Sequence, residues 1–383
     1  MKSDFDDIRP YNADELPAAF ARVSADQRFR SALATVVPEA QIDALLAKIG
    51  QTTSATEFQK VFVKPLLSQL IVSRTDGLTY DGLERSDTPS LFVSNHRDIV
   101  IDPAFLDYTQ FLAGNDSVEI GIGDNLLSLP WVREAVRINK CFVVRRGLPR
   151  GEQVAALKQL SAYIRYAICE KHASVWIAQR EGRAKDSNDR TQESILKMFS
   201  LSGDGTFIDN LKALNIRPVS ISYEFDPCDY LKAKELQQRR DDAAFAKSAQ
   251  DDIDSMRMGI TGRKGRVHYA YTPIINAELD ALAAATTDRK EQVAAVAALI
   301  DHRIHFNYVI YPINRVAYDL LTGENRFANA YSDAEKAVAT AYLDGQLSKI
   351  DLPNRDEAFL WTKLLEMYAN PLKNWLAAHN LLF

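Results

Sequence analysis

The stretch that decides the fold is LFVSNHRDIVIDP, residues 91–103, where an apolar run gives way to polar residues around a histidine. The segment 89–96 predicts a buried strand, because it is short, apolar and followed by polar residues. The segment 102–114 predicts a helix that ends on Gly114. The histidine, His96, is therefore expected where a strand gives way to a helix.

The same alternation of strands and helices continues on both sides of this stretch. It predicts an α/β fold with a mixed, largely parallel sheet covered by helices. Helical patterns on either side predict a helical N-terminal region (1–75), an α/β domain (76–278) and a helical C-terminal region (279–383). The polar segment 233–256 predicts a solvated helical insertion. The expected strands lie within 77–84, 89–96, 117–124, 140–147, 173–182, 216–225 and 265–274.

The composition narrows the classes of partner. The 383 residues carry a net charge of −5, so nucleic acid is not expected as a partner. Three widely spaced cysteines and the spacing of the histidines favour neither a disulfide framework nor a metal site. The N-terminal stretch is acidic and does not resemble a signal peptide, and no run reaches the ~18 apolar residues of a membrane span. A soluble or peripheral protein in a reducing compartment is expected.

His96 is the candidate catalytic residue. A nearby carboxylate can accept its Nδ1 proton and leave Nε2 free to deprotonate a hydroxyl. Two aspartates are close enough in sequence, Asp98 in the turn and Asp102 in the first turns of the helix. We assign Asp102 as the residue that orients His96 and Asp98 as a helix cap.

Two further strands end in basic residues, within 138–147 and 176–190. Guanidinium groups suit phosphate, and ligands of open α/β sheets gather at the carboxyl ends of strands. Taken alone, each cluster is equally typical of a solvated loop. Together with His96 they predict a substrate that bears both a hydroxyl and a phosphate. The residues expected to bind it are Arg145, Arg146, Glu181, Gly182, Arg183 and Lys185.

Four blocks of the sequence, in order over about 80–275, resemble those of the glycerolipid acyltransferase superfamily. This family contains the glycerol-3-phosphate and 1-acylglycerol-3-phosphate acyltransferases. The blocks are Asn95, His96, Asp102 and Pro103; then Phe142 to Arg146; then Glu181 and Gly182; then Ile216 to Tyr223.

Two blocks depart from the family pattern. Five residues rather than four separate His96 from the aspartate, and a strict count falls on Ile101. In the third block an arginine directly follows the glycine, so Arg183 or Lys185 must replace the family's later arginine.

The resemblance implies acyl transfer from acyl-CoA or an acyl-carrier protein to the hydroxyl of lysophosphatidate or glycerol 3-phosphate, with no other cofactor. His96 would deprotonate the hydroxyl, and the basic residues would hold the phosphate. Two alternatives stay open: another acceptor such as a lyso-aminolipid, and a non-catalytic lipid- or acyl-carrier-binding relative.

A lipid product implies peripheral contact with the membrane surface, in the cytoplasm at the inner face of the cell membrane. The segments 61–73 and 359–383 are candidates for this contact, the latter as an interfacial helix pair. An amphipathic helix docked on the protein body explains 359–383 equally well.

Overall fold

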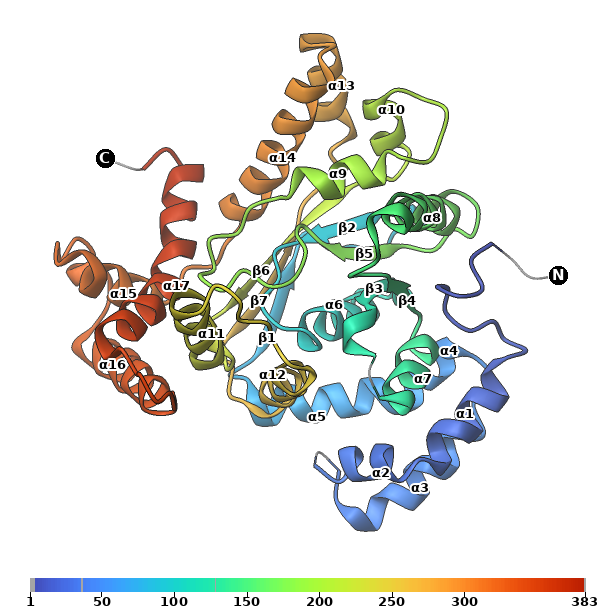
Figure 1. Ribbon diagram of the computed structural model, residues 1–383, viewed down its shortest axis with the longest axis horizontal. Coiled ribbons are helices and arrows are strands. Elements are labelled where there is room, and N and C mark those ends of the chain that lie inside the picture. The colour runs from blue at the N-terminus through green and yellow to red at the C-terminus, as the bar shows by residue number, and fades with distance from the viewer. Residues whose placement is uncertain (1–3, 36, 128, 382–383) are drawn as a thin grey trace.

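The computed structural model describes residues 4–35, 37–127 and 129–381. Within them, seven strands form one sheet in the order β1-β7-β6-β2-β5-β3-β4, and helices cover both of its faces (Figure 1). The strands are Leu78–Asp81 (β1), Leu91–Ser94 (β2), Glu119–Gly123 (β3), Cys141–Val144 (β4), Val175–Ala178 (β5), Arg217–Tyr223 (β6) and Val267–Tyr271 (β7).

Most neighbouring strands of the sheet are parallel. β6 and β7 form an antiparallel pair, and β1 is parallel to β7. β1 and β7 therefore run opposite to the other five strands. The predicted α/β class with a mixed, largely parallel sheet is confirmed. The carboxyl ends of β6, β2 and β5 are neighbours in the sheet, so the polar residues that follow these strands meet at one edge.

The side chains of β2 alternate between two hydrophobic cores, one on each face of the sheet. Leu91 and Val93 belong to the first core and Phe92 to the second. Helices of the first face are α8 (Arg150–Cys169), α9 (Glu193–Phe199), α10 (Phe207–Lys212), α13 (Asn276–Ala285) and α14 (Arg289–Phe306); those of the second include α5 (Lys64–Arg74) and α6 (Ile101–Leu112).

The N-terminal helices form a core of their own beside α7 (Pro130–Ile138). They are α1 (Leu16–Ala25), α2 (Gln27–Leu33), α3 (Glu39–Ile49) and α4 (Ala55–Phe58), and a π-helical segment η1 (Gln59–Val63) joins them to α5. The segment 61–73 is thus part of η1 and α5. It buries Leu67 against the sheet and exposes Val72.

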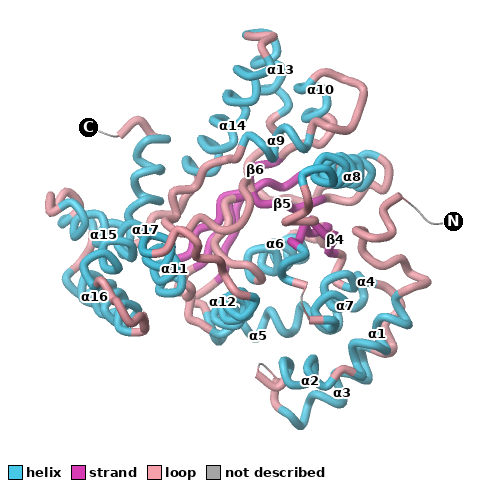
Figure 2. Tube along the Cα trace, viewed as in Figure 1, coloured by secondary structure: helices cyan, strands magenta, loops and turns pink. Residues whose placement is uncertain are grey.

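The C-terminal helices cluster at the other end of the molecule (Figures 1 and 2). They are α15 (Pro312–Thr322), α16 (Asp333–Ser348) and α17 (Glu357–Ala378), with a short 3-10 helix at Ala328–Ala330 (η3). Another 3-10 helix, Asp124–Leu126 (η2), directly follows β3. The predicted helix pair at 359–383 is wrong for the described part, which is the single helix α17 up to Ala378. Its buried leucines, such as Leu364, pack into the protein body, as the alternative interpretation holds.

The predicted solvated insertion at 233–256 is also wrong in part. It forms the end of α11 (Asp229–Asp241) and the start of α12 (Ala249–Thr261), and α11 buries Glu235 and Gln237 although both are polar. Glu235 is tolerated inside because Lys185 pairs with it at 2.9 Å. The division into three regions stays a prediction. Among the described residues, no helix combines the length and apolar character that crossing a bilayer requires.

Candidate active site

His96 and Asp102 form a hydrogen-bonded pair at the carboxyl end of β2. Nδ1 of His96 lies 2.8 Å from Oδ2 of Asp102, which is fully buried, whereas the histidine side chain is 12% exposed. The same oxygen accepts hydrogen bonds from the backbone N–H groups of Arg97 (2.6 Å) and Asp98 (3.0 Å). The carboxylate is therefore fixed, and it holds the Nδ1 proton so that Nε2 is the nitrogen left to accept a proton.

The strand end that carries His96 is tied to its neighbours by side chains. The Asn95 amide donates to the carbonyl of Ile221 (2.9 Å) and accepts from its N–H (2.8 Å), which extends the pairing of β2 with β6 past the strand. The Trp176 indole N–H donates to Oγ of Ser94 (3.0 Å), and its ring lies edge-on to His96 with centroids 5.7 Å apart. The backbone before the histidine is therefore rigid.

Asp98 does not reach His96. Its Oδ1 accepts from the N–H groups of Val100 (2.9 Å) and Ile101 (2.8 Å), so it satisfies donors in the turn that leads into α6. The N-cap residue of α6 itself is Val100, whose side chain makes no capping hydrogen bond. Asp98 lies directly beneath Gly259 of α12. Burial, together with the nearby Asp102 carboxylate, raises the pKa of Asp98.

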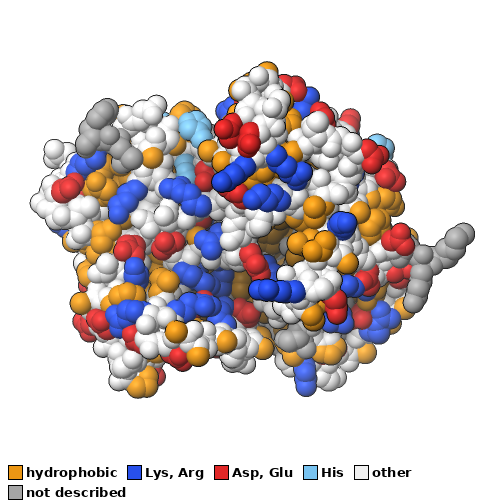
Figure 3. Space-filling view, turned by 45° about the horizontal axis from the view of Figure 1, so that its top comes forward, with side chains coloured by type: hydrophobic (Ala, Val, Ile, Leu, Met, Phe, Trp, Pro, Cys, Tyr) orange, Lys and Arg blue, Asp and Glu red, His pale blue; other side chains and the backbone are white. Residues whose placement is uncertain are grey.

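A cleft of about 1640 Å³ opens beside His96. Its walls come from η1, α5, α7, α8, α9, α12 and the loops after β2, β4 and β5, and most of them are apolar. Figure 3 shows a face of the molecule that is hollowed near its middle, where hydrophobic and basic side chains gather. Apolar wall residues include Leu66, Leu70, Val132, Leu157, Met256 and Ile260. The cleft has the size and lining expected for a lipid-like ligand.

The structure brings all six predicted substrate-binding residues to this cleft, together with His96, whereas Asp98 and Asp102 lie behind the histidine. The six predicted residues differ in whether their side chains are free to bind a ligand. Arg145 forms an ion pair with Asp7 of the N-terminal segment. Arg146 lies 3.7 Å from Glu181, at the limit of an ion pair, and Gly123 makes room for it, because a Cβ there would lie 2.8 Å from its Nε.

The loop after β5 holds the other three predicted residues. Gly182 adopts a positive φ of 68°, which glycine accepts without strain. Arg183 lines the cleft, although its side chain is mostly buried. Lys185 is paired with Glu235, and burial and the nearby Arg183 lower its pKa to about 8.

Arg180 was not among the predicted binding residues. It lines the cleft, and among the described residues no hydrogen bond or ion pair to its guanidinium occurs. Its position directly after β5 in the third sequence block was the available signal. Most of the apolar wall from α12 was missed as well, because the polar residues around it in the sequence suggested a solvated surface.

Comparison with known proteins bears on this geometry. A family model described as Acyltransferase matches residues 77–202. Over this segment the chain is similar to the acyltransferase family. The match includes His96, Asp102 and all the predicted binding residues, and it confirms the resemblance to the glycerolipid acyltransferase superfamily.

One solved structure, the 1-acyl-sn-glycerophosphate (LPA) acyltransferase PlsC from Thermotoga maritima, shares 11% sequence identity with this chain. That match covers 76% of this chain and 93% of the other, with a TM-score of 0.36, which is too low to support conclusions about the site. No curated protein matches the sequence significantly.

Proposed function

We propose that this acyltransferase moves a fatty acyl group from an acyl thioester to a hydroxyl of a glycerol phosphate, either lysophosphatidate or glycerol 3-phosphate. The observation that carries the proposal is the His96–Asp102 pair, 2.8 Å apart, on the wall of a large and mostly apolar cleft. A base oriented by a buried carboxylate is the arrangement that activates a hydroxyl.

The chemistry proceeds through His96. Nε2 takes the proton of the acceptor hydroxyl as its oxygen attacks the thioester carbonyl, and the tetrahedral intermediate then breaks its C–S bond. The departing thiolate takes the proton back from the imidazolium, so an ester and a free thiol are formed. Asp102 stabilises the imidazolium and keeps its ring in place.

The walls of the cleft suit both substrates. Apolar side chains of α5, α7, α8 and α12 can bury an acyl chain, at ~0.8 kcal/mol per methylene group. The donor we propose is acyl-CoA or an acyl-carrier protein, with no further cofactor. For the acceptor phosphate, Arg180 and Arg146 are the most available cations, with Arg183 and Lys185 beneath.

We also propose that the protein works in the cytoplasm as a peripheral protein at the inner face of the cell membrane. Val72 of α5, the helix that forms one wall of the cleft, is 83% exposed, and Val61 of η1 is 38% exposed. A lipid surface would cover these side chains near the cleft. Co-sedimentation with anionic vesicles, which should fall in Val72→Asp relative to wild type, tests this placement.

A thiol-release assay tests the activity itself. Acyl-CoA and acyl-carrier-protein donors are combined with lysophosphatidate, glycerol 3-phosphate or a lyso-aminolipid, and the ester product is identified by mass. Release that depends on a phosphate-bearing acceptor and disappears in His96→Ala is the expected result. Thiol release with the lyso-aminolipid alone would show that the acceptor is a lyso-aminolipid and not a glycerol phosphate. Lipid binding without any thiol release would identify a non-catalytic relative.

A further inference from the structure

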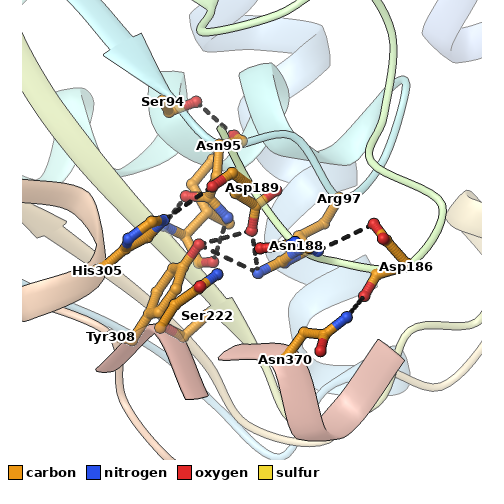
Figure 4. Close-up of polar contacts among 12 residues, drawn as sticks. Ser94, Asn95, Arg97, Asp186, Asn188, Asp189, Ser222, His305, Tyr308 and Asn370 are labelled. Carbon is orange, nitrogen blue, oxygen red and sulfur yellow. Dashed lines mark hydrogen bonds and ion pairs between the residues drawn. The ribbon is translucent and has the colours of Figure 1, made fainter. Parts of the chain in front are cut away.

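Arg97 follows the candidate base directly, yet its side chain leaves the cleft and enters the protein. It is 6% exposed, and its Nη2 lies 2.8 Å from Oδ2 of Asp189, whose side chain is completely buried. Its guanidinium carbon lies 5.7 Å from the centre of the Tyr308 ring. Figure 4 shows the three side chains meeting between the loop after β5 and the chain after α14.

Tyr308 closes this cluster. Its hydroxyl donates to Oδ2 of Asp189 at 2.6 Å, on the oxygen that also faces Arg97. His305 lies beside them, with Nε2 3.0 Å from the backbone carbonyl of Asp189. Burial and the charge of Arg190 lower the pKa of His305 to about 4, so it is neutral near pH 7. Arg97 is therefore the cation that compensates the Asp189 carboxylate.

The backbone of Arg97 is held on both sides as well. Its N–H donates to Asp102, the carboxylate that also bonds His96. Its carbonyl accepts a hydrogen bond of 3.0 Å from Nζ of Lys232, which is itself buried and paired with Asp226. Arg97, the residue directly after His96, is thus fixed at its side chain, its N–H and its carbonyl.

We propose that Arg97, Asp189 and Tyr308 form a positioning unit that holds His96 and Asp102 in register for proton transfer. The inference rests on the proposed function and adds residues that do not touch substrate. Tyr308 and Lys232 lie outside the matched segment 77–202, so parts of the chain beyond that segment complete the proposed site.

The energetics of proton transfer explain why such a unit matters. A general base must stay within hydrogen-bond reach of the proton it removes, and a displacement of about 1 Å lowers a rate by ~10²-fold. Arg97 shares a peptide unit with His96, so any backbone shift that follows the loss of its side-chain contacts displaces the histidine. Substrate affinity depends on the cleft walls, and Arg97, Asp189 and Tyr308 do not line the cleft.

Tyr308→Phe tests the proposal, because it keeps the ring and removes only the hydroxyl. The matched control is Tyr163→Phe. Tyr163 is 1% exposed in the same core, and its hydroxyl also bonds a buried carboxylate, that of Glu119, but it is not a cleft residue. We expect kcat of Tyr308→Phe to fall about tenfold or more with KM within twofold of wild type. Asp189→Asn should show the same split, and thermal midpoints should fall similarly in Tyr308→Phe and the control.

The outcomes separate this inference from the proposed function. A kcat for Tyr308→Phe equal to that of Tyr163→Phe, with the wild type active, would overturn the positioning role alone. An increase in KM without a decrease in kcat would overturn it as well. A wild-type protein that transfers no acyl group from any donor would overturn the proposed function and this inference together.

Discussion

A β-carbon on Gly259 would lie 1.9 Å from Oδ2 of Asp98, so α12 rests directly on the carboxylate that bonds the first N–H group of α6. That helix also forms part of the cleft wall. Gly259→Ala is expected to push α12 away from the loop after β2, because Asp98 is buried and held by two backbone groups. We expect a loss of 1–3 kcal/mol in the free energy of unfolding, typical of overpacking, and reduced acyl transfer.

Gly345→Ala is the matched control for this substitution. Gly345 lies within α16, and nothing lies within 4 Å of an added Cβ. Helix propensity alone then predicts a gain of roughly 0.5–1 kcal/mol. Urea unfolding measures the free energy of unfolding of the two variants. Equal values would show that α12 can shift to accommodate the added Cβ without loss of stability.

Asp102 and Asp98 should differ in their effect on catalysis. In Asp102→Asn, an amide replaces the carboxylate that orients and stabilises the His96 imidazolium, so kcat is expected to fall by ~10²–10⁴-fold. Asp98→Asn retains a carbonyl oxygen for the N–H groups of Val100 and Ile101, so its loss should be far smaller. Steady-state thiol release compares them, and equal losses would contradict the assignment of Asp102 as the orienting residue.

Arg180 should determine the affinity for a phosphate-bearing acceptor. Arg180→Gln removes a cleft guanidinium that is unpaired among the described residues, and a hydrogen bond to a charged group contributes ~1.5–3 kcal/mol. The KM for the acceptor is expected to rise roughly ten- to a hundredfold, while the KM for the thioester changes little. Arg150→Gln, an exposed arginine outside the cleft lining, is the control. An unchanged acceptor KM in Arg180→Gln would show that the acceptor phosphate binds elsewhere.

Lys185 should make acceptor binding depend on pH. Burial and Arg183 lower its pKa to about 8, so the ammonium is charged below that pH and neutral above it. If Lys185 contacts the phosphate, the acceptor KM is low below pH 8 and rises as the pH increases through it. Lys185→Arg stays charged throughout this range, so its KM should be flat from pH 7 to 9.5. An identical rise in the two proteins would exclude Lys185 as the titrating group.

The sequence was informative wherever a local pattern decides the outcome. Short segments of strand length predicted all seven strands. β2, which is buried on both faces, reads as a continuous apolar run, whereas β1 was indicated by a strand-like segment with turn residues. The order of strands and helices then placed His96, Arg146 and Glu181 at strand ends that share one edge of the sheet. The Asp98 and Asp102 assignments followed from their places before and inside the first turn of α6.

Contacts between residues that are far apart in the sequence could not be predicted from local patterns. Tyr308 lies 211 residues from Arg97, and Lys232 lies 135 residues from it, so no periodicity connects them to the catalytic loop. The burial of Glu235 depends on Lys185, which belongs to a different loop. A polar segment is predicted to be solvent-exposed unless the oppositely charged residues that pair with it are known. Only the tertiary structure shows which residues these are.

The pairing of β1 has a consequence for how the chain folds. Leu78 of β1 is opposite Val267 of β7, and these residues are 267 − 78 = 189 positions apart. During synthesis β1 therefore stays without its neighbour until β7 has left the ribosome, whereas β6 can already pair with β2. Closing so large a loop is slow and leaves strand edges open to other chains. A fragment that ends at residue 202 would lack both β6 and β7, so the edge of β2 would stay exposed and prone to aggregation.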